Sequence, residues 1–140
     1  YCLVYKELVP PESLVKVPFI KYQTDASVAN IIETWCAEHF DEPPSVAMDV
    51  NSMSTCRHFV RAGLGWSILT YMGLGSCKDK DIYVSPLRSK NGEYITRDTN
   101  MVYTKDSENL IVVNTFIEYV RNYYKEHTVV DNSIFREYKS

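Results

Sequence analysis

Two closely spaced glycines, Gly63 and Gly65, lie between an amphipathic segment and a short apolar one. Glycine is the usual residue just past the end of a helix, because it adopts the left-handed conformation without a clash of Cβ. Residues 66–69 then continue as a short apolar strand. This order predicts a tight joint from a helix to a strand in an α/β sheet. The helix before Gly63 has apolar residues at helical spacing, namely Met53, Cys56, Phe59 and Val60.

The same order excludes one common use of paired glycines. In a dinucleotide-binding fingerprint the glycines follow a strand and open a helix, whereas here they follow a helix and open a strand. A third glycine at the required offset is also missing. We therefore expect no dinucleotide site at this joint.

Strand and helix patterns alternate through the first half of the chain. Short apolar segments predict strands over residues 1–5, 17–22 and 45–50, and apolar periodicity predicts helices over residues 27–40 and 52–62. Connections this short and regular favour a parallel or mixed sheet with flanking helices. The fold class is therefore expected to be α/β.

Caps and stop signals agree with these limits. Thr24, Asp25 and Ser27 are candidate caps at the start of the first helix, and Ser52 is the candidate cap of the second. The proline pair at residues 43–44 prevents the first helix from continuing.

The second half of the chain has a looser pattern. A polar loop over residues 73–80 precedes predicted strands over residues 82–87 and 94–104, and the turn signal Asn91-Gly92 separates these two strands. The middle of the second strand is polar, as expected of a strand that leaves one layer and enters another.

The last predicted helix spans residues 109–124 and has a single apolar stripe. Asp106 or Ser107 is the candidate cap at its start. Tyr119 and Tyr123 fall off the main stripe and are candidates for an interface, where tyrosine is enriched. The stripe consists of Leu110, Val113, Phe116, Ile117, Val120 and Tyr124.

The composition is typical of one soluble globular domain. The chain has 140 residues, of which 45% are hydrophobic and 24% charged, and its formal net charge is −3. It lacks the clustered lysines and arginines that a nucleic-acid backbone requires. It also has no apolar run long enough to span a membrane, so no membrane contact is expected. Because Tyr1 is not a natural start, we expect the chain to be a piece of a longer protein.

The cysteines and histidines do not predict a metal site or a nucleophile. Cys36–His39 and Cys56–His58 each fall on a helix, and structural zinc needs four converging ligands. No Gly-x-Ser-x-Gly elbow is present. We therefore expect no metal, no cofactor and no enzymatic activity. Small buried thiols in a reducing compartment, the cytoplasm, explain the four cysteines better than disulfides do. They are Cys2, Cys36, Cys56 and Cys77.

Two polar loops that open helices are the best candidates for a binding site. They follow the predicted strands that end at Tyr22 and Val50, and in a parallel sheet both loops fall at the carboxyl edge, where open α/β sheets place ligands. Helix amino termini at this edge favour a small anion, which Asp25 would oppose unless it pointed outward. Helix capping alone is the alternative explanation. The candidate ligand-binding residues are Gln23, Thr24, Ser27, Asn51, Ser52 and Ser54.

Three weak motifs in a fixed order carry a resemblance to a known family. They are FVRAGLGWSIL at residues 59–69 preceded by the strand end Val50-Asn51-Ser52, LVKVPFIKY at residues 14–22, and MVYTK at residues 101–105 followed by FIEYV at residues 116–120. Together they resemble the effector-binding domain of LysR-type transcriptional regulators over roughly residues 14–124. One departure is Thr70, where that family usually has proline after the apolar strand.

The resemblance implies two α/β lobes joined by two crossing strands, similar to periplasmic solute-binding proteins, with an effector between the lobes. Residues 13–96 would form the second lobe, and residues 1–12 and 97–108 would form the crossing strands at the hinge. Residues 109–140 would be the returning carboxyl-terminal helix and tail. The chain would then be part of an effector-binding domain, and its two polar loops would line one wall of the effector cleft.

The resemblance also implies a role in transcription regulation. A small anionic effector would bind between the lobes and shift the DNA-binding state of a homo-oligomer. DNA would be read only by a helix-turn-helix domain that is absent from this chain. Two alternatives stay open, a solute-binding protein of a transporter and an interaction module without a small ligand.

Overall fold

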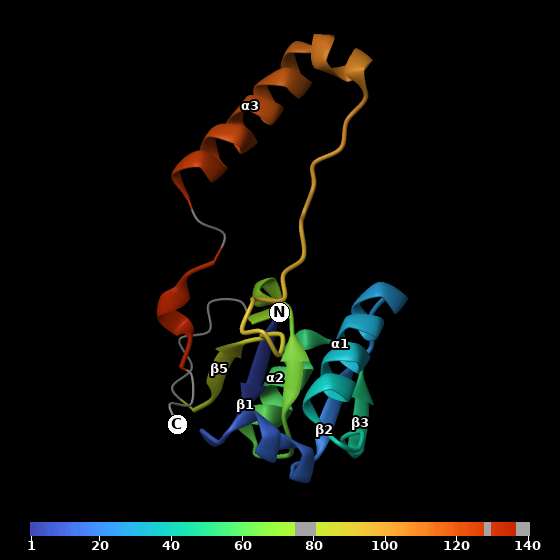
Figure 1. The fold of residues 1–140 in the computed structure, drawn as a ribbon. Helices are drawn as coiled ribbons and strands as arrows, with labels where there is room; N and C mark the ends of the chain where they lie inside the picture. Colours follow the sequence, from blue (N-terminus) through green and yellow to red (C-terminus); the bar gives the residue numbers. More distant parts are fainter. Residues whose placement is uncertain (75–80, 128–129, 137–140) are drawn as a thin grey trace. The chain divides into compact units, whose positions relative to one another are not determined.

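The chain forms two compact units in the computed structural model, which describes residues 1–74, 81–127 and 130–136. The first unit comprises residues 1–96 together with the chain from residue 134, and the second comprises residues 97–133. The strands and two long helices belong to the first unit, and the last long helix belongs to the second (Figure 1).

The first unit contains a mixed sheet. β1 is the middle strand of an antiparallel set of order β4-β1-β5, and β2 pairs in parallel with β3. A parallel bridge between Phe19 and Trp66 brings β4 alongside β2. At this bridge the amide of Trp66 donates to the carbonyl of Pro18 (3.0 Å), and the amide of Ile20 donates to the carbonyl of Trp66 (2.8 Å). The strands are β1 (Cys2–Tyr5), β2 (Phe19–Tyr22), β3 (Val46–Val50), β4 (Ser67–Leu69) and β5 (Tyr83–Pro86).

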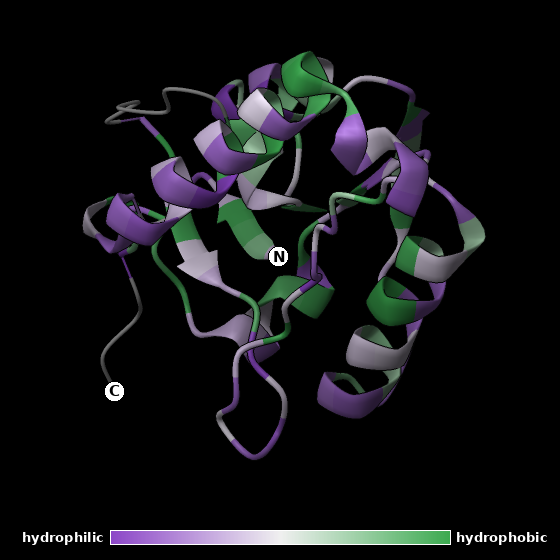
Figure 2. Ribbon diagram, turned by 90° about the horizontal axis from the view of Figure 1, so that it is seen from above, coloured by the Kyte–Doolittle hydropathy of each residue, from purple (hydrophilic) through white to green (hydrophobic). Residues whose placement is uncertain are grey.

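Helices α1 (Ala26–His39) and α2 (Met53–Arg61) cover opposite faces of this sheet. Successive residues of a strand point to opposite faces, and β1 shows the consequence. Leu3 and Tyr5 pack in the same buried cluster as the inner side of α1, whereas Cys2 and Val4 pack in the cluster that contains α2. The helices carry both hydrophobic and hydrophilic residues along their coils, as amphipathic helices do (Figure 2).

The structure confirms the predicted α/β class and the elements of the first half of the chain, whose limits differ by one or two residues. The side chain of Asp25 caps α1 by accepting from the amide of Val28 (3.0 Å). Ser52 caps α2 by accepting from the amide of Thr55 (3.3 Å). Gly63 follows α2 in the left-handed region, with φ +78°. The assignment of the segments to a second lobe, a hinge and a returning helix stays a prediction.

The predicted strand over residues 94–104 is wrong. Only an isolated antiparallel bridge between Arg88 and Tyr94 forms there, although the turn before it is present and the amide of Gly92 donates to the carbonyl of Ser89 (2.9 Å). Residues 97–104 form no strand ladder. A strand requires a neighbouring strand for its backbone groups, and no strand of the described residues pairs with this polar segment.

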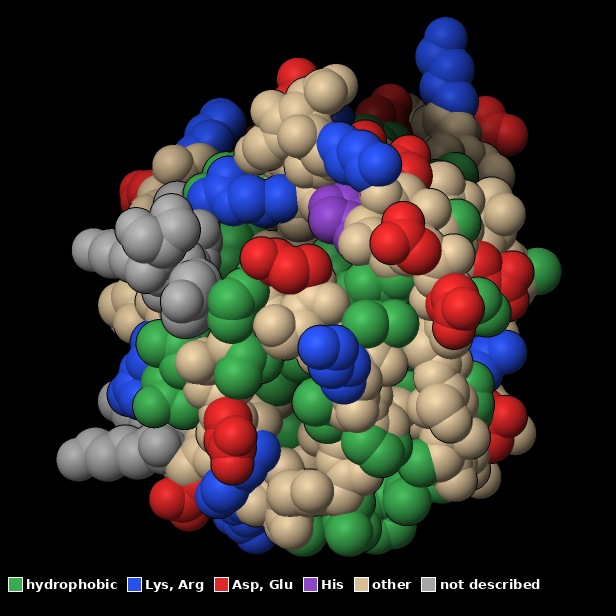
Figure 3. Space-filling model, turned by 60° about the horizontal axis from the view of Figure 1, so that its bottom comes forward, with side chains coloured by type: hydrophobic (Ala, Val, Ile, Leu, Met, Phe, Trp, Pro, Cys, Tyr) green, Lys and Arg blue, Asp and Glu red, His purple; other side chains and the backbone are tan. Residues whose placement is uncertain are grey.

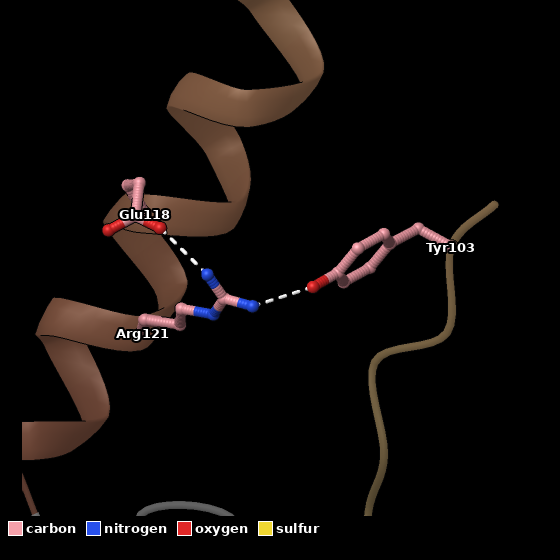
Figure 4. Close-up of polar contacts among 3 residues, drawn as sticks. All are labelled: Tyr103, Glu118 and Arg121. Atoms are coloured by element: carbon pink, nitrogen blue, oxygen red, sulfur yellow. Dashed lines mark hydrogen bonds and ion pairs between the residues drawn. The ribbon is translucent and has the colours of Figure 1, made fainter. Parts of the chain in front are cut away.

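The second unit consists of an extended segment, the 3-10 turn η3 (Lys105–Asn109) and helix α3 (Ile111–Glu126). The predicted cap at Asp106 or Ser107 is wrong, because both residues lie inside η3, and Thr104 caps that turn by accepting from the amide of Ser107 (3.3 Å). Arg121 ties the extended segment to α3. Its guanidinium donates to the hydroxyl of Tyr103 (2.6 Å) and to Glu118 (2.8 Å), as Figure 4 shows.

The apolar stripe of α3 is largely open to solvent. Ile117 is buried, but Phe116 is 60% exposed, as is most of the side chain of Leu110 before the helix. Ile111 and Val112 at the start of the helix are more than four-fifths exposed, at 84% and 81%. In the part of the chain that the structure describes, no helix is both long and apolar enough to cross a membrane.

The end of the described chain returns to the first unit. After the short turn η4 (Asn132–Ile134), the amide of Arg136 donates to the carbonyl of Val84 in β5 (2.8 Å). The hydroxyl of Ser85 donates to the carbonyl of Arg136 (2.9 Å), and Ser85 also shares a hydrogen bond with the hydroxyl of Tyr5 (2.5 Å). Residues 134–136, the carboxyl-terminal strap, therefore cover the outer edge of β5.

The turn between α2 and β4 passes very close to the segment before β2. A Cβ placed on Gly65 would overlap the carbonyl oxygen of Pro18, whereas a Cβ on Gly63 would meet nothing within 4 Å. The close approach lets Trp66 pair with β2, and the indole of Trp66 donates to the carbonyl of Val17 (3.0 Å).

We predict that Gly65→Ala destabilises the chain more than Gly63→Ala. Gly63→Ala should lower the free energy of unfolding by about 1 kcal/mol, because alanine disfavours the left-handed backbone conformation and the added methyl group meets no other atom. Gly65→Ala should cost at least about 2 kcal/mol, because the added methyl group separates β4 from β2. Urea unfolding followed by circular dichroism measures both values, and equal losses for the two variants would contradict the close approach.

Candidate functional site

The carboxyl ends of three strands meet at one edge of the sheet. β2, β3 and β4 run parallel through the Tyr22–Val50 pairing and the Phe19–Trp66 bridge. The amide of Gln23 donates to the carbonyl of Val50 (2.7 Å), which holds the loop after β2 directly against the loop after β3. The structure thus brings together the two polar loops that the sequence singled out, at the edge where such sheets place ligands.

The six predicted residues all lie at or near the surface of this edge. Gln23 and Asn51 are exposed in the loops, Ser27 and Ser54 are exposed in the first turns of α1 and α2, and Thr24 and Ser52 are half-buried. Their role in ligand binding stays a prediction. Their exposure makes this edge of the sheet accessible to a ligand.

The two helix amino termini differ in charge. Asp25 places a carboxylate on the amide of Val28, so the positive end of α1 already has a negative partner. Ser52 caps α2 with a neutral hydroxyl, so the positive end of α2 is not neutralised by its own cap. The start of α2 is therefore the better position for an anion, and the start of α1 is not.

The loop after β4 also reaches this edge, which the sequence reading missed. Thr70 directly follows β4, and its hydroxyl contacts the sulfur of Met53 (3.5 Å) at the start of α2. The same oxygen accepts from the amide of Gly73 (3.3 Å) in the 3-10 turn η2 (Tyr71–Leu74). The sequence did contain one indication of this. Thr70 directly follows the apolar strand, at a position where the family that the chain resembles usually has proline.

A cavity of about 810 Å³ adjoins the same edge. It lies between α1, β2 and β3, and of the six predicted residues only Gln23 and Thr24 line it. Sequence reasoning gave no sign of it, because its lining residues come from segments that are separate in the sequence, namely α1, the loop after it, β2 and β3.

Packing accounts for the three described cysteines and for His39. Cys2, Cys36 and Cys56 are buried and form no disulfide, which confirms the expectation for these three; Cys77 lies outside the described residues. His39 stacks on Trp35 (4.3 Å between ring centroids). Within the described ranges, no group of three or more histidine, cysteine or acidic side chains converges as metal ligands would.

Burial also makes these thiols poor nucleophiles. It raises the pKa of Cys2 and of Cys36 to about 11, and it raises the pKa of Cys56 as well. All three thiols therefore remain protonated at neutral pH. Because the thiolate is the reactive form, they are poor nucleophiles.

The visible surface has no basic patch of the kind that binds nucleic acid. On the face shown in Figure 3, lysine and arginine side chains are scattered among aspartate and glutamate side chains. A phosphate backbone requires clustered positive charge, so this face offers no such interface.

One family model matches nearly the whole chain, and two curated relatives are similar to it. Residues 2–125 match the family model described as the LysR substrate binding domain. The chain is 34% identical over 119 residues to YraN of Bacillus subtilis (strain 168), an uncharacterized HTH-type transcriptional regulator, with 85% of this chain and 40% of that protein covered. YkuM of the same strain, which carries the same description, is 27% identical over 105 residues, with 75% of this chain and 35% of that protein covered.

The chain spans less than half the length of these relatives. Among solved structures, it is similar to the crystal structure of CbnR, a LysR family transcriptional regulator, with 14% identity and a TM-score of 0.46. That similarity covers 65% of this chain and 34% of CbnR.

We predict that the stabilising contribution of the Cys36 thiol is lost at high pH. Its folded pKa of about 11 lies above the unfolded value of about 8.5, so the contribution is complete below about pH 8.5 and falls as the pH rises toward 11. The loss of stability caused by Cys36→Ala should therefore shrink between pH 8 and pH 11. Val28→Ala on the same helix has no titrating thiol and serves as the control. Urea unfolding at each pH measures both, and parallel behaviour of the two variants would contradict the prediction.

Proposed function

The chain belongs to the LysR substrate-binding domain family, and we propose that it is the effector-sensing carboxyl-terminal part of a LysR-type transcriptional regulator. The observation that carries the proposal is the family match over residues 2–125, nearly the whole chain. The relatives are named as HTH-type transcriptional regulators, and the chain covers 40% and 35% of their lengths. DNA would thus be bound by a helix-turn-helix domain elsewhere in the complete protein.

The effector is proposed to bind at the carboxyl edge of the sheet. The amide and hydroxyl side chains of Gln23, Asn51 and Ser54 are exposed there, and the adjoining loops are linked by the hydrogen bond from Gln23 to Val50. A small anionic effector fits this position, because the cap of α2 is the neutral hydroxyl of Ser52 and not a carboxylate, so the positive end of the helix dipole is not offset there. Ser27, Ser52 and Thr24 would complete its polar surroundings.

Regulation would follow from a shift between two arrangements of a two-lobed domain. An effector that contacts both lobes favours one arrangement by its differential affinity, and in a homo-oligomer this alters how the DNA-binding domains are placed. The buried, unpaired thiols of Cys2, Cys36 and Cys56 are typical of a reducing compartment, so we place the regulator in the cytoplasm rather than among exported solute-binding proteins.

We predict that Asn51→Ala combined with Ser54→Ala separates effector response from DNA binding in the complete regulator. Small carboxylates would first be screened by thermal shift to select an effector. The double variant should bind that effector at least about tenfold more weakly, because each lost hydrogen bond to a charged group costs about 1.5 kcal/mol. Its affinity for operator DNA, measured by fluorescence anisotropy without effector, should stay unchanged.

Thr115→Ala, on the exposed side of α3, is the matched control and should behave as the parent protein. If the double variant binds the effector with unchanged affinity, the effector does not bind at this edge of the sheet. If the complete regulator does not bind operator DNA at all, the proposed regulatory function is refuted.

We predict that the isolated 140-residue chain self-associates through α3. The helix is proposed to pack on the other lobe in the complete regulator, and without that lobe it exposes Val112 and Phe116. Sedimentation velocity should show a concentration-dependent oligomer. Val112→Asp with Phe116→Asp should shift it to monomer, whereas Asn114→Asp with Asn122→Asp, exposed changes that add the same two charges to the same helix, should not. A monomeric profile of the parent chain at high concentration would contradict the prediction.

A further inference from the structure

The 3-10 turn η2 is tied to the first half of α2, whose start is the proposed effector position. The hydroxyl of Thr70, just before the turn, contacts the sulfur of Met53 in the first turn of α2 (3.5 Å). A Cβ placed on Gly73 would overlap the same sulfur, so η2 packs closely on Met53. At the end of η2, the guanidinium of Arg57 donates to the carbonyl of Leu74, a fully buried residue. The position of η2 therefore determines one wall of the effector edge.

The carboxyl-terminal strap lies against the same turn. The ring of Phe135 meets the ring of Tyr71 at a steep angle, with 6.3 Å between the ring centroids and 69° between the ring planes. Tyr71 and Phe135, together with Ile134, pack against one buried cluster that contains Leu74 and Val84. A displacement of the strap would therefore remove an aromatic partner from the first residue of η2.

The strap is fixed to β5 by its own polar and aromatic contacts. The amide of Arg136 donates to the carbonyl of Val84 (2.8 Å), and the guanidinium of Arg136 lies over the ring of Tyr83 (5.8 Å to the ring centroid). The buried hydroxyl of Ser85 donates to the carbonyl of Arg136 (2.9 Å). Release of the strap would take these partners away from Val84 and Ser85, so the bound strap is the favoured state.

The strap is nevertheless the part of the first unit that is most readily released. Segments near a chain end that are held by few contacts open locally at a lower free energy than a domain core does. Arg136 is exposed and Phe135 half-buried, whereas Val84 beneath them is buried. The chain reaches the strap only through residues 97–133, the second unit, so a rearrangement of that unit would act on the strap through the backbone.

We propose that the carboxyl-terminal strap controls the effector edge through η2. When the strap is bound, the ring of Phe135 on Tyr71 holds η2 against the start of α2, and the edge has the shape that an effector contacts. When the strap is released, η2 loosens and the effector binds more weakly. Phe135 is thus a positioning residue that acts through Tyr71. Because coupling between two sites is reciprocal, an effector that orders η2 also favours the bound strap.

The link to an effector rests on the proposed function, whereas the coupling between the strap and η2 does not. The coupling is therefore measured first, in the 140-residue chain without any ligand, by amide hydrogen exchange followed by NMR. The amide of Gly73, which donates to the carbonyl of Thr70 (2.9 Å), reports on η2. The amide of Arg136 reports on the strap. The amide of Ile20, which donates to the carbonyl of Trp66 (2.8 Å), reports on the sheet.

Phe135→Ala should raise the exchange rates of Gly73 and Arg136 at least about fivefold, the lower end of typical coupling between sites, and leave that of Ile20 unchanged. Phe135→Tyr keeps the ring and should behave as the parent chain. Tyr94→Ala removes a ring that is 56% exposed elsewhere in the first unit, and it should change none of the three rates. An unchanged rate at Gly73, or an equal rise at Ile20, would overturn the proposal.

A double variant tests whether the coupling passes through Tyr71. In a chain that already carries Tyr71→Ala, the change Phe135→Ala should cause no further rise in the exchange rate of Gly73, because the contact between the two rings is already lost. If the rises caused by the two changes add, Phe135 does not act through Tyr71 and its assignment as a positioning residue fails.

The effect on binding is measured in the complete regulator, with the small carboxylate selected by thermal shift as the probe. Phe135→Ala should weaken its binding at least about fivefold, and Phe135→Tyr should not. Unchanged affinity together with faster exchange at Gly73 would refute control of the edge by the strap. If Asn51→Ala with Ser54→Ala leaves the affinity unchanged, the effector site itself is wrong, while hydrogen exchange still decides the coupling. The two failures are therefore distinguishable.

Discussion

The passage of Gly65 against the carbonyl of Pro18 is the constraint on which the arrangement of the first unit depends. It lets the backbone of Trp66 pair with β2, and this pairing joins the antiparallel strands to the parallel ones. The ring of Trp66 is fully buried and lies against Phe19 and Phe40, at 4.7 and 5.9 Å between ring centroids. A larger residue at position 65 would separate the strands whose carboxyl ends form the candidate site.

The capping residues decide the electrostatics of that site. A carboxylate on α1 and a hydroxyl on α2 both satisfy a backbone amide, and for stability the two are nearly interchangeable. For a ligand they are not, because only the hydroxyl leaves the helix dipole unopposed. In the sequence, capping alone explains both Asp25 and Ser52. In the structure, the two caps differ in their effect on a bound ligand, because one is charged and the other is neutral.

Local patterns in the sequence predicted those parts of the fold that local physics determines. Apolar periodicity, Asp25 and Ser52 as caps, and Gly63 as a helix stop all depend on residues near one another in the chain. The strand predicted over residues 94–104 failed because a strand requires a distant partner, and the cap predicted at Asp106 or Ser107 failed because Thr104 starts a separate turn first. Thr70 and the cavity were missed for a related reason, since each is defined by what distant segments bring beside it.

The carboxyl-terminal strap makes the first unit discontinuous in sequence. The strap belongs to the first unit because the amide of Arg136 donates to the carbonyl of Val84 and the carbonyl of Arg136 accepts from the hydroxyl of Ser85. Residues 97–133 are therefore an insertion between two parts of the first unit. A protease that cuts once inside this insertion would not release the strap, which would stay bound by its own contacts as a noncovalently held segment. The first unit would then persist as a two-chain complex, and its stability would become dependent on concentration.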